Sequence, residues 1–160
     1  RVKAALPPRD TGAPPPEAGP TTPAGAEVLG LEDIDDLLRA HTQAPADLEI
    51  GRRLAAALEA RREWPRLVAV LASLTELAED AQERASLLER MADALYTGMG
   101  DPESAADCLL DAAAILGSPR GAVFARKAAG ILESEGLTEA AARAKAEAER
   151  LDPTRDSWGD

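Results

Sequence analysis

The sequence predicts an all-α fold, an α-solenoid of about three antiparallel helical hairpins preceded by one helix. Apolar residues recur at helical spacing along most of the chain, which is typical of helices with one buried face. Glycine and proline interrupt these segments at short intervals, and breaks this short return the chain antiparallel to itself. The chain has only two Trp, one Tyr and one Phe, whereas a β-sandwich would need more aromatic and β-branched residues.

The first 26 residues differ in composition from the rest of the chain. Seven prolines stand there among Gly, Ala and Thr, at positions 7, 8, 14–16, 20 and 23. Proline removes backbone donors and holds the preceding residue in extended conformations, and the few large apolar residues cannot offset the entropy of ordering. We therefore expect residues 1–26 to be a disordered, semi-rigid linker. The alternative is a ligand for a proline-binding module, but no arginine-flanked core supports it.

A helical repeat domain is predicted over residues 27–153, with a short C-terminal tail over 154–160. Its first helix begins near Leu31 and ends before Pro45. Several acidic residues stand at its start, where they suit the positive end of the helix dipole. Three of them, Asp33, Asp35 and Asp36, lack the glycine turn and final glutamate of an EF-hand, so a calcium site is not expected.

The later helices follow from glycine and proline punctuation. Pro65 stands near the start of one segment, where its missing N–H costs little. Gly136 is a candidate C-terminal cap, and Asp152-Pro153 ends the last segment. The helices are predicted at 47–62, from Trp64 through Leu77, from about Gln82 to a break at Gly98–Pro102, from there to Leu116, from Ser118 to Ser134, and from Thr138 to Leu151.

Each predicted helix has one apolar stripe that needs a partner. In the helix that begins at Trp64 the stripe is Leu67, Val68, Leu71, Leu74 and Leu77. In the two helices flanking Gly98 it is Leu88, Met91, Ala92, Leu95 and Tyr96, then Ala105, Leu109, Ala112 and Leu116. In the helix that begins at Ser118 it is Val123, Phe124, Ala128, Ile131 and Leu132. Leu95 and Tyr96 compete for one position, which leaves the register of that helix uncertain by one residue.

The hairpins repeat along the chain. Apolar fragments that begin at Leu54, Met91 and Ala128 follow one another at steps of 37 residues. A glycine and two alanines recur at a step of 36, first as Gly100, Ala105 and Ala112 and then as Gly136, Ala141 and Ala148. A period in the thirties with two helices per unit is the mark of an α-solenoid.

These units resemble tetratricopeptide repeats (TPR), which implies a right-handed, TPR-like superhelix. The matching residues are Tyr96, Gly100, Ala105, Leu109 and Ala112 in the middle unit, Gly136, Ala141, Ala148 and Pro153 in the last, and Pro45 and Trp64 in the first. The likeness covers roughly residues 31–153. The chain departs from the family pattern in its period of 36 to 38 residues and in lacking the tryptophan of the first helix of each repeat. Lys145 also replaces an apolar residue, which would suit a terminal capping helix.

A row of basic residues follows the repeat. Arg53, Arg90 and Lys127 are separated by 37 residues each, so stacked units would place them side by side. The resemblance implies that the first helices of the units line a concave groove, where basic residues can clamp the carboxylates of a peptide. Guanidinium groups suit that role because they bind carboxylates with two hydrogen bonds. The candidate peptide-binding residues are Arg52, Arg53, Arg90, Arg126 and Lys127.

Two other interpretations of the row stay open. Four carboxylates stand within one or two helical turns and would neutralise it as surface ion pairs, namely Glu49, Glu59, Glu89 and Asp93. The arginine stems would alternatively pack between units.

Catalytic motifs are absent from the sequence. His41 and Cys108, the only His and Cys, stand 67 positions apart on different units. His41 is expected at a helix end and Cys108 as a small buried thiol. The resemblance thus implies a non-catalytic interaction scaffold that needs no cofactor or metal. Its partner would be a protein or peptide with acidic side chains or a C-terminal carboxylate.

The same sequence leaves alternative functions open. One is a helical regulatory or accessory domain of a larger signalling or secretion enzyme, and another is a self-assembly module. A net charge of −11 argues against nucleic acid and anionic membranes as partners. No run approaches the ~18 apolar residues of a membrane span, so a cytoplasmic protein is expected. Because the chain starts with Arg1, we expect it to be a segment of a longer one.

Overall fold

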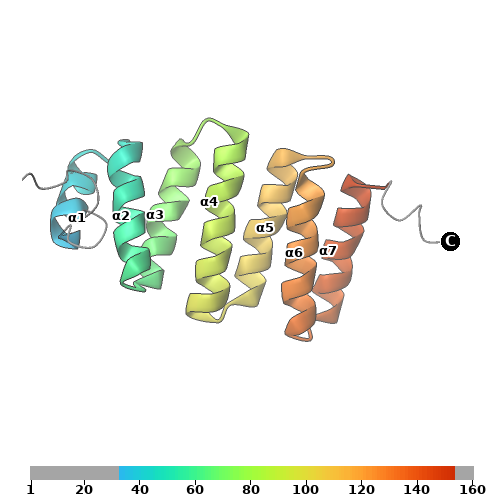
Figure 1. The fold of residues 1–160 in the computed structure, drawn as a ribbon. Coiled ribbons are helices and arrows are strands. Elements are labelled where there is room, and N and C mark those ends of the chain that lie inside the picture. The colour runs from blue at the N-terminus through green and yellow to red at the C-terminus, as the bar shows by residue number, and fades with distance from the viewer. Residues whose placement is uncertain (1–32, 154–160) are drawn as a thin grey trace, which may run out of the picture.

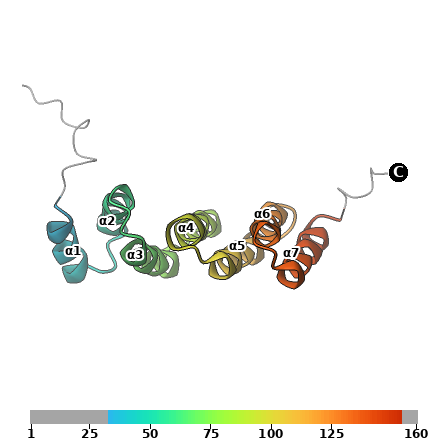
Figure 2. The same cartoon turned by 90° about the horizontal axis from the view of Figure 1, so that it is seen from below.

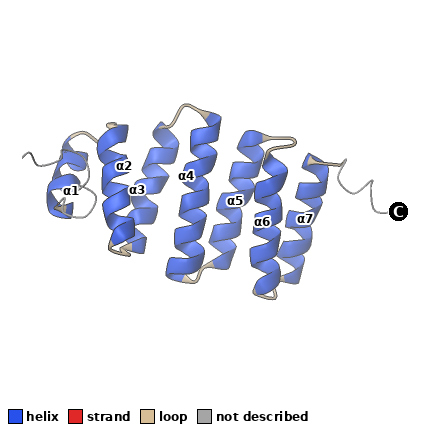
Figure 3. Ribbon diagram, viewed as in Figure 1, coloured by secondary structure: helices blue, strands red, loops and turns tan. Residues whose placement is uncertain are grey.

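The computed structural model describes residues 33–153, which form seven α-helices and one π-helical segment without a β-strand (Figure 3). The all-α prediction is therefore confirmed for this part of the chain. The predicted linker over 1–26 and tail over 154–160 lie outside the described residues. The elements are α1 (Ile34–Gln43), α2 (Leu48–Ala60), α3 (Trp64–Leu77), α4 (Ala81–Asp93), η1 (Ala94–Met99), α5 (Pro102–Leu116), α6 (Gly121–Ser134) and α7 (Thr138–Leu151).

The helices stand side by side in chain order, and each packs mainly against the one before and the one after it (Figure 1). Viewed along the helices, they alternate between two layers (Figure 2). We call the layer of α2, α4 and α6 the A layer, and the layer of α1, α3, α5 and α7 the B layer. Short connections of a few residues enforce this alternation, because they leave no length to reach a more distant helix.

Aspartates fix the starts of four helices. The side chains of Asp33, Asp47, Asp80 and Asp101 accept hydrogen bonds from backbone N–H groups in the first turns of α1, α2, α4 and α5. Each bond satisfies a donor that has no partner within its helix. Asp33 also has an extended backbone, with φ −66° and ψ 116°. Helix α1 therefore begins at Ile34 and not near Leu31, as the apolar spacing had suggested.

Most other helix bounds agree with the predictions. Helix α7 spans Thr138–Leu151, as predicted. Helix α6 begins at Gly121, three residues later than predicted, because residues 118–120 form a turn. His41 lies in the last turn of α1, as predicted.

The π-helical segment η1 resolves the competition between Leu95 and Tyr96. A π-helix has a wider turn than an α-helix, with i→i+5 hydrogen bonds. Through this turn Leu95 is buried, with 8% of its surface exposed, while Tyr96 still packs against the same apolar cluster. Tyr96 also donates a 3.1 Å hydrogen bond from its hydroxyl group to Glu135, beyond the end of α6. Both residues therefore contact neighbouring helices.

The core between the two layers is made of leucine and alanine. No polar or charged residue within 33–153 is buried. The largest fully buried side chains are Leu54, Leu58, Leu67, Leu71, Leu74 and Leu109. Two predicted core residues are wrong, because Val123 is 63% exposed and Leu77 is 37% exposed. Val70, which the prediction omitted, is buried in place of Leu77.

Two glycines allow close contacts between elements. A Cβ atom at Gly121 would lie 2.2 Å from the backbone oxygen of Ala113, where α6 meets α5. A Cβ atom at Gly98 in η1 would lie 2.4 Å from the indole ring of Trp64 at the start of α3. Real Cβ atoms do not approach other heavy atoms so closely, so both contacts depend on the missing side chain.

Candidate functional site

The five predicted binding residues all belong to the A layer. Arg52 and Arg53 are on α2, Arg90 is on α4, and Arg126 and Lys127 are on α6. The step of 37 residues thus corresponds to successive helices of this layer. None of the five lies on a B-layer helix, so any shared site would be on the A-layer side of the molecule.

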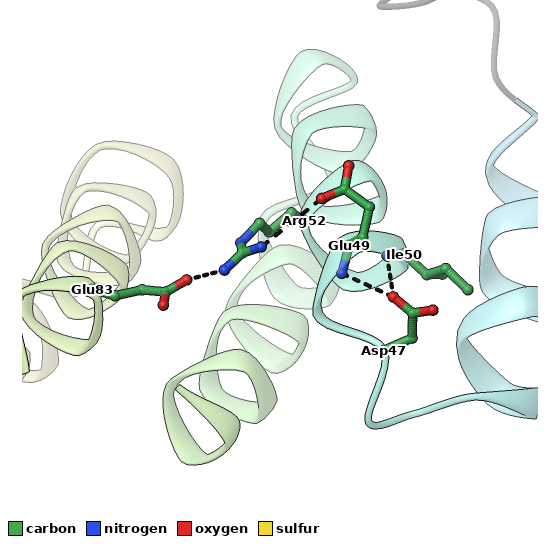
Figure 4. A network of polar contacts seen from close by, with 5 residues as sticks. All are labelled: Asp47, Glu49, Ile50, Arg52 and Glu83. Carbon is green, nitrogen blue, oxygen red and sulfur yellow. Dashed lines mark hydrogen bonds and ion pairs between the residues drawn. The ribbon is translucent and has the colours of Figure 1, made fainter. Parts of the chain in front are cut away.

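An ion pair links α2 to α4 at Arg52. Its guanidinium group donates a short hydrogen bond to the carboxylate of Glu83 on α4 (Figure 4). The hydrogen bond and charge of Glu83 raise the pKa of Arg52. Within α2, the carboxylate of Glu49 lies 3.9 Å from the same guanidinium group, and Asp47 caps the helix beneath it (Figure 4).

Two further cations reach back to the preceding A-layer helix. Arg90 on α4 lies 2.6 Å from the carboxylate of Glu59 on α2. Lys127 on α6 lies 2.9 Å from Glu89 and 3.0 Å from Asp93, both on α4. Desolvation lowers the pKa of Lys127, but the hydrogen bonds to the two carboxylates outweigh it, and the pKa is raised.

The charged pairs have a common orientation. The charged pairs are Arg52-Arg53, Glu89-Arg90 and Arg126-Lys127. The first residue of each bonds to a residue later in the chain: Arg52 to Glu83 of α4, Glu89 to Lys127 of α6, and Arg126 to Asp152 after α7, at 2.8 Å. The second residue, shown by Arg90 and Lys127, bonds toward the preceding unit. The direction of these bonds is thus similar from one pair to the next, although the partner residues lie at different offsets.

These ion pairs are exposed enough to be weak. The side chains of Arg52 and Glu83 are 44% and 31% exposed, and those of Arg90 and Glu59 are 35% and 50% exposed. Exposed pairs of this kind contribute about 0–1 kcal/mol each, because water and salt screen them. The cations therefore have defined positions, but their present ion pairs cost little free energy to break.

Two of the five candidate residues, Arg52 and Arg90, line one hollow between α2 and α4. Its volume is about 490 Å³, and it is lined by Arg52, Asp80, Gln82, Glu83, Ser86, Leu87 and Arg90. Arg52 belongs to α2, whereas Arg90 and the mostly buried Leu87 belong to α4. Leu87 was not predicted as a site residue, although its position three residues before Arg90 places the two on one face of α4.

The other three predicted residues do not share this hollow. Arg53 lines a separate hollow between α1 and α2, and Arg126 lines a small one of about 130 Å³ between α6 and α7. Lys127 lines none of these three hollows. The structure therefore brings together Arg52 and Arg90, and distributes the rest along the A layer.

Cys108 is half-buried on α5 among apolar residues. Burial, followed by the nearby charges of Asp111, Asp107 and Asp101, raises the pKa of its thiol to about 11 from 9.0. Since only the thiolate reacts, we expect Cys108 to react with iodoacetamide at pH 8 about a hundredfold more slowly than in urea-unfolded protein. Timed labelling followed by mass spectrometry measures both rates. Equal rates in the folded and unfolded protein would contradict this assignment.

Residues 33–153 contain no group of three or more His, Cys, Asp and Glu side chains placed to hold a metal ion. Within the same residues, none of the helices is long and apolar enough to cross a membrane. Neither a protein-family model nor a curated protein matches the chain. The case for its function therefore depends on the described residues.

Proposed function

We propose that the chain is a non-catalytic protein–protein interaction scaffold, built as a right-handed, TPR-like α-solenoid. It binds a peptide or partner helix on the A layer. The serial packing of the helices and their alternation between two layers support this architecture (Figure 2). The site consists of Arg52, Arg53, Arg90, Arg126 and Lys127, with the hollow between α2 and α4 at its centre.

The observation that carries the proposal is the pair of arginines in the hollow. Both already pair with carboxylates, Arg52 with Glu83, which also lines the hollow, and Arg90 with Glu59 on α2. A ligand carboxylate exchanges with these at little cost, because the resident pairs are exposed and weak. The gain comes from two-point guanidinium–carboxylate bonding. The ligand class is therefore a peptide with acidic side chains or a free C-terminus.

The remaining cations extend the site along the layer. Arg53 is next to Arg52 on α2 and lines the separate hollow between α1 and α2, and Arg126 and Lys127 follow on α6. A segment that crosses α2, α4 and α6 meets basic side chains on all three helices. This arrangement favours an elongated partner with several carboxylates over a compact ligand with one.

Charge reversal tests the site against a matched control. We expect Arg52→Glu/Arg90→Glu to weaken binding of acidic peptides with a free C-terminus at least tenfold, because two charge-assisted contacts become repulsive. Fluorescence anisotropy on an array of such peptides, with amidated copies beside them, measures the affinity. Circular dichroism establishes that the variant remains helical.

The control reverses the same number of charges on the B layer. Arg39 and Arg66 also form local ion pairs, each with a carboxylate three residues earlier, Asp36 at 2.7 Å and Glu63 at 3.0 Å. Arg39→Glu/Arg66→Glu should therefore leave peptide affinity within about twofold of wild type, since the net-charge effect alone is screened at physiological salt. If both variants bind as wild type does, the A-layer ion pairs only link helices, and the proposed site is wrong.

A further inference from the structure

The turn between α2 and α3 contains a strained residue. Arg62 has a φ of 58°, in the left-handed region that favours glycine because a Cβ atom is crowded there. Within residues 33–153 it is the only non-glycine residue with a positive φ. Strain of this kind persists where a side chain has a role that outweighs it. The side chain of Arg62 is therefore a starting point in the search for a second functional surface.

The repeat shows which residue this turn holds elsewhere. Two steps of 37 residues from Arg62 lead to Gly136, which follows α6 with a φ of 75°. The N–H of Gly136 bonds to the carbonyl group three residues earlier, and the next N–H bonds to the carbonyl group five residues earlier, at 3.0 and 2.8 Å. Arg62 and its successor make the same two bonds, at 3.0 and 2.9 Å. Gly100, after η1, is left-handed too. The fold thus accepts glycine at this position, and an arginine stands there at a cost in backbone energy.

Arg62 is one of two adjacent cations in this turn. Arg61 and Arg62 are both exposed, and neither forms an ion pair within residues 33–153. The nearest carboxylate in sequence, that of Glu63, pairs with Arg66 at 3.0 Å. Two guanidinium groups without a partner carboxylate form a local positive charge on a chain whose net charge is −11.

Apolar side chains lie beside the two arginines. Trp64 begins α3 and is partly exposed, and its indole ring packs against Gly98 of η1, where a Cβ atom would lie 2.4 Å away. This contact brings the next residue of η1, Met99, to the same end of the array as the turn between α2 and α3 (Figure 1). The side chain of Met99 is 47% exposed. Pro65, on α3, is exposed as well.

We call these five residues the turn surface: Arg61, Arg62, Trp64, Pro65 and Met99. Tryptophan, methionine and arginine are the residue types enriched where proteins bind one another. A methionine side chain also adapts to partners of different shape. The π-helical turn that presents Met99 is a rare element that occurs frequently at functional sites. The backbone strain, the unpaired charge and the exposed apolar side chains thus meet at one place.

We propose that the turn surface binds a partner protein through a segment in which carboxylates flank an apolar side chain. The two guanidinium groups bind the carboxylates, each with two hydrogen bonds. The apolar side chain covers Trp64 and Met99 and removes their exposed area from water. The net charge of −11 disfavours a second copy of the chain and nucleic acid as occupants. The turn surface shares no residue with the peptide site on the A layer, and its ligand needs no free C-terminus.

The fluorescence of Trp64 reports directly on this surface. In a Trp158→Phe background, Trp64 is the only tryptophan of the chain. The probes are short amidated peptides without tryptophan, in which two glutamates stand on each side of Leu, Ile or Phe. We expect saturable changes in the emission of Trp64. Arg61→Glu/Arg62→Glu should weaken this binding at least tenfold, because two attractive contacts become repulsive.

Two further double variants serve as controls. Arg120 and Arg143 are exposed arginines on the α5–α6 turn and on α7, so Arg120→Glu/Arg143→Glu makes the same change in net charge elsewhere. This variant and Arg52→Glu/Arg90→Glu should both bind the amidated peptides within about twofold of wild type, because distant charges are screened. If Arg52→Glu/Arg90→Glu abolishes the binding and Arg61→Glu/Arg62→Glu does not, these peptides bind the A layer, and the proposal is wrong.

Glycine at position 62 separates binding from folding. Arg62→Gly should raise the Tm by about 2–5 °C, because glycine relieves the left-handed strain. The same variant should bind the peptides about fivefold more weakly, because one charge-assisted contact is lost. A stabilised Arg62→Gly variant that binds as wild type does would overturn the proposal. It would also be overturned by an emission of Trp64 that responds to an oligothymidine and not to the peptides, or by a dimer in sedimentation that Arg61→Glu/Arg62→Glu dissociates.

Discussion

Replacing Leu109 with Ala is expected to lower the free energy of unfolding by about 2–5 kcal/mol. Leu109 is 0% exposed and lies in the middle of α5, between α4 and α6. The cluster around it is unusual in being mostly alanine, as at Ala92, Ala105, Ala128 and Ala141. Alanine has no rotamers through which it can fill the space left by a leucine, so the cavity persists. We therefore expect a value in the upper half of this range.

The repeat supplies a control for this substitution. Lys145 on α7 is the equivalent of Leu109 one step of 36 residues later, but its side chain is 53% exposed and paired with Glu133. Lys145→Ala removes an exposed ion pair and should cost less than about 1 kcal/mol. Urea denaturation followed by circular dichroism measures both variants. Similar losses for the two would show that Leu109 is not a centre of the core.

The second large effect is expected at Gly121. A Cβ atom there would lie 2.2 Å from the backbone oxygen and 2.9 Å from the carbonyl carbon of Ala113. Backbone atoms cannot move aside as a flexible side chain can, so α6 must shift away from α5 along their whole contact. Overpacking of this kind costs about 1–3 kcal/mol and occasionally more. For Gly121→Ala we expect at least about 3 kcal/mol.

Gly130 gives the opposite result in the same helix. A Cβ atom there would meet no heavy atom within 4 Å. Gly130→Ala should therefore stabilise the protein by about 0.5–1 kcal/mol, because alanine loses less backbone entropy in a helix. Chemical denaturation of both variants, at one protein concentration, measures the contrast. A destabilised Gly130→Ala variant, or an unchanged Gly121→Ala variant, would contradict the close contact between α5 and α6.

The bounds of a helix were predictable where glycine or proline marks its ends. Helix α7 has its predicted bounds because Gly136 precedes it and Asp152-Pro153 follows it. The start of α1 was not, because Leu31 continues the apolar spacing while Asp33 interrupts the helix by capping it. A local hydrogen bond outweighs a hydrophobic pattern there, and the pattern contains no information about it.

The helical register after α4 could not be predicted from the sequence, for a different reason. Periodicity assumes 3.6 residues per turn, and on that assumption only one of Leu95 and Tyr96 faces the core. The π-helical turn changes the local period, so both make tertiary contacts. Nothing in the sequence specifies where an extra residue enters a turn. The contact between Gly98 and Trp64, which depends on this geometry, was unpredictable for the same reason.

The helices that carry the candidate residues were predictable, and the partners of those residues were not. The step of 37 residues was enough to assign the cations to successive helices of the A layer. The choice of partner was not, since Arg52 has two carboxylates within reach, Glu49 and Glu83, and bonds most closely to the one on α4. Asp152, the partner of Arg126, follows a different helix. The partner of a long side chain depends on distances between helices. Residue spacing along one helix does not give these distances.

The serial packing of the helices also has a kinetic consequence. Because each helix packs mainly against its sequence neighbours, most contacts form between segments close in the chain, and low contact order favours folding in microseconds to milliseconds. Any adjacent pair of helices can start the process, and order then spreads toward both ends. The same geometry makes unfolding begin at the ends. The hollow between α2 and α4 lies between inner helices of the array, so it can stay intact while a terminal helix opens and closes.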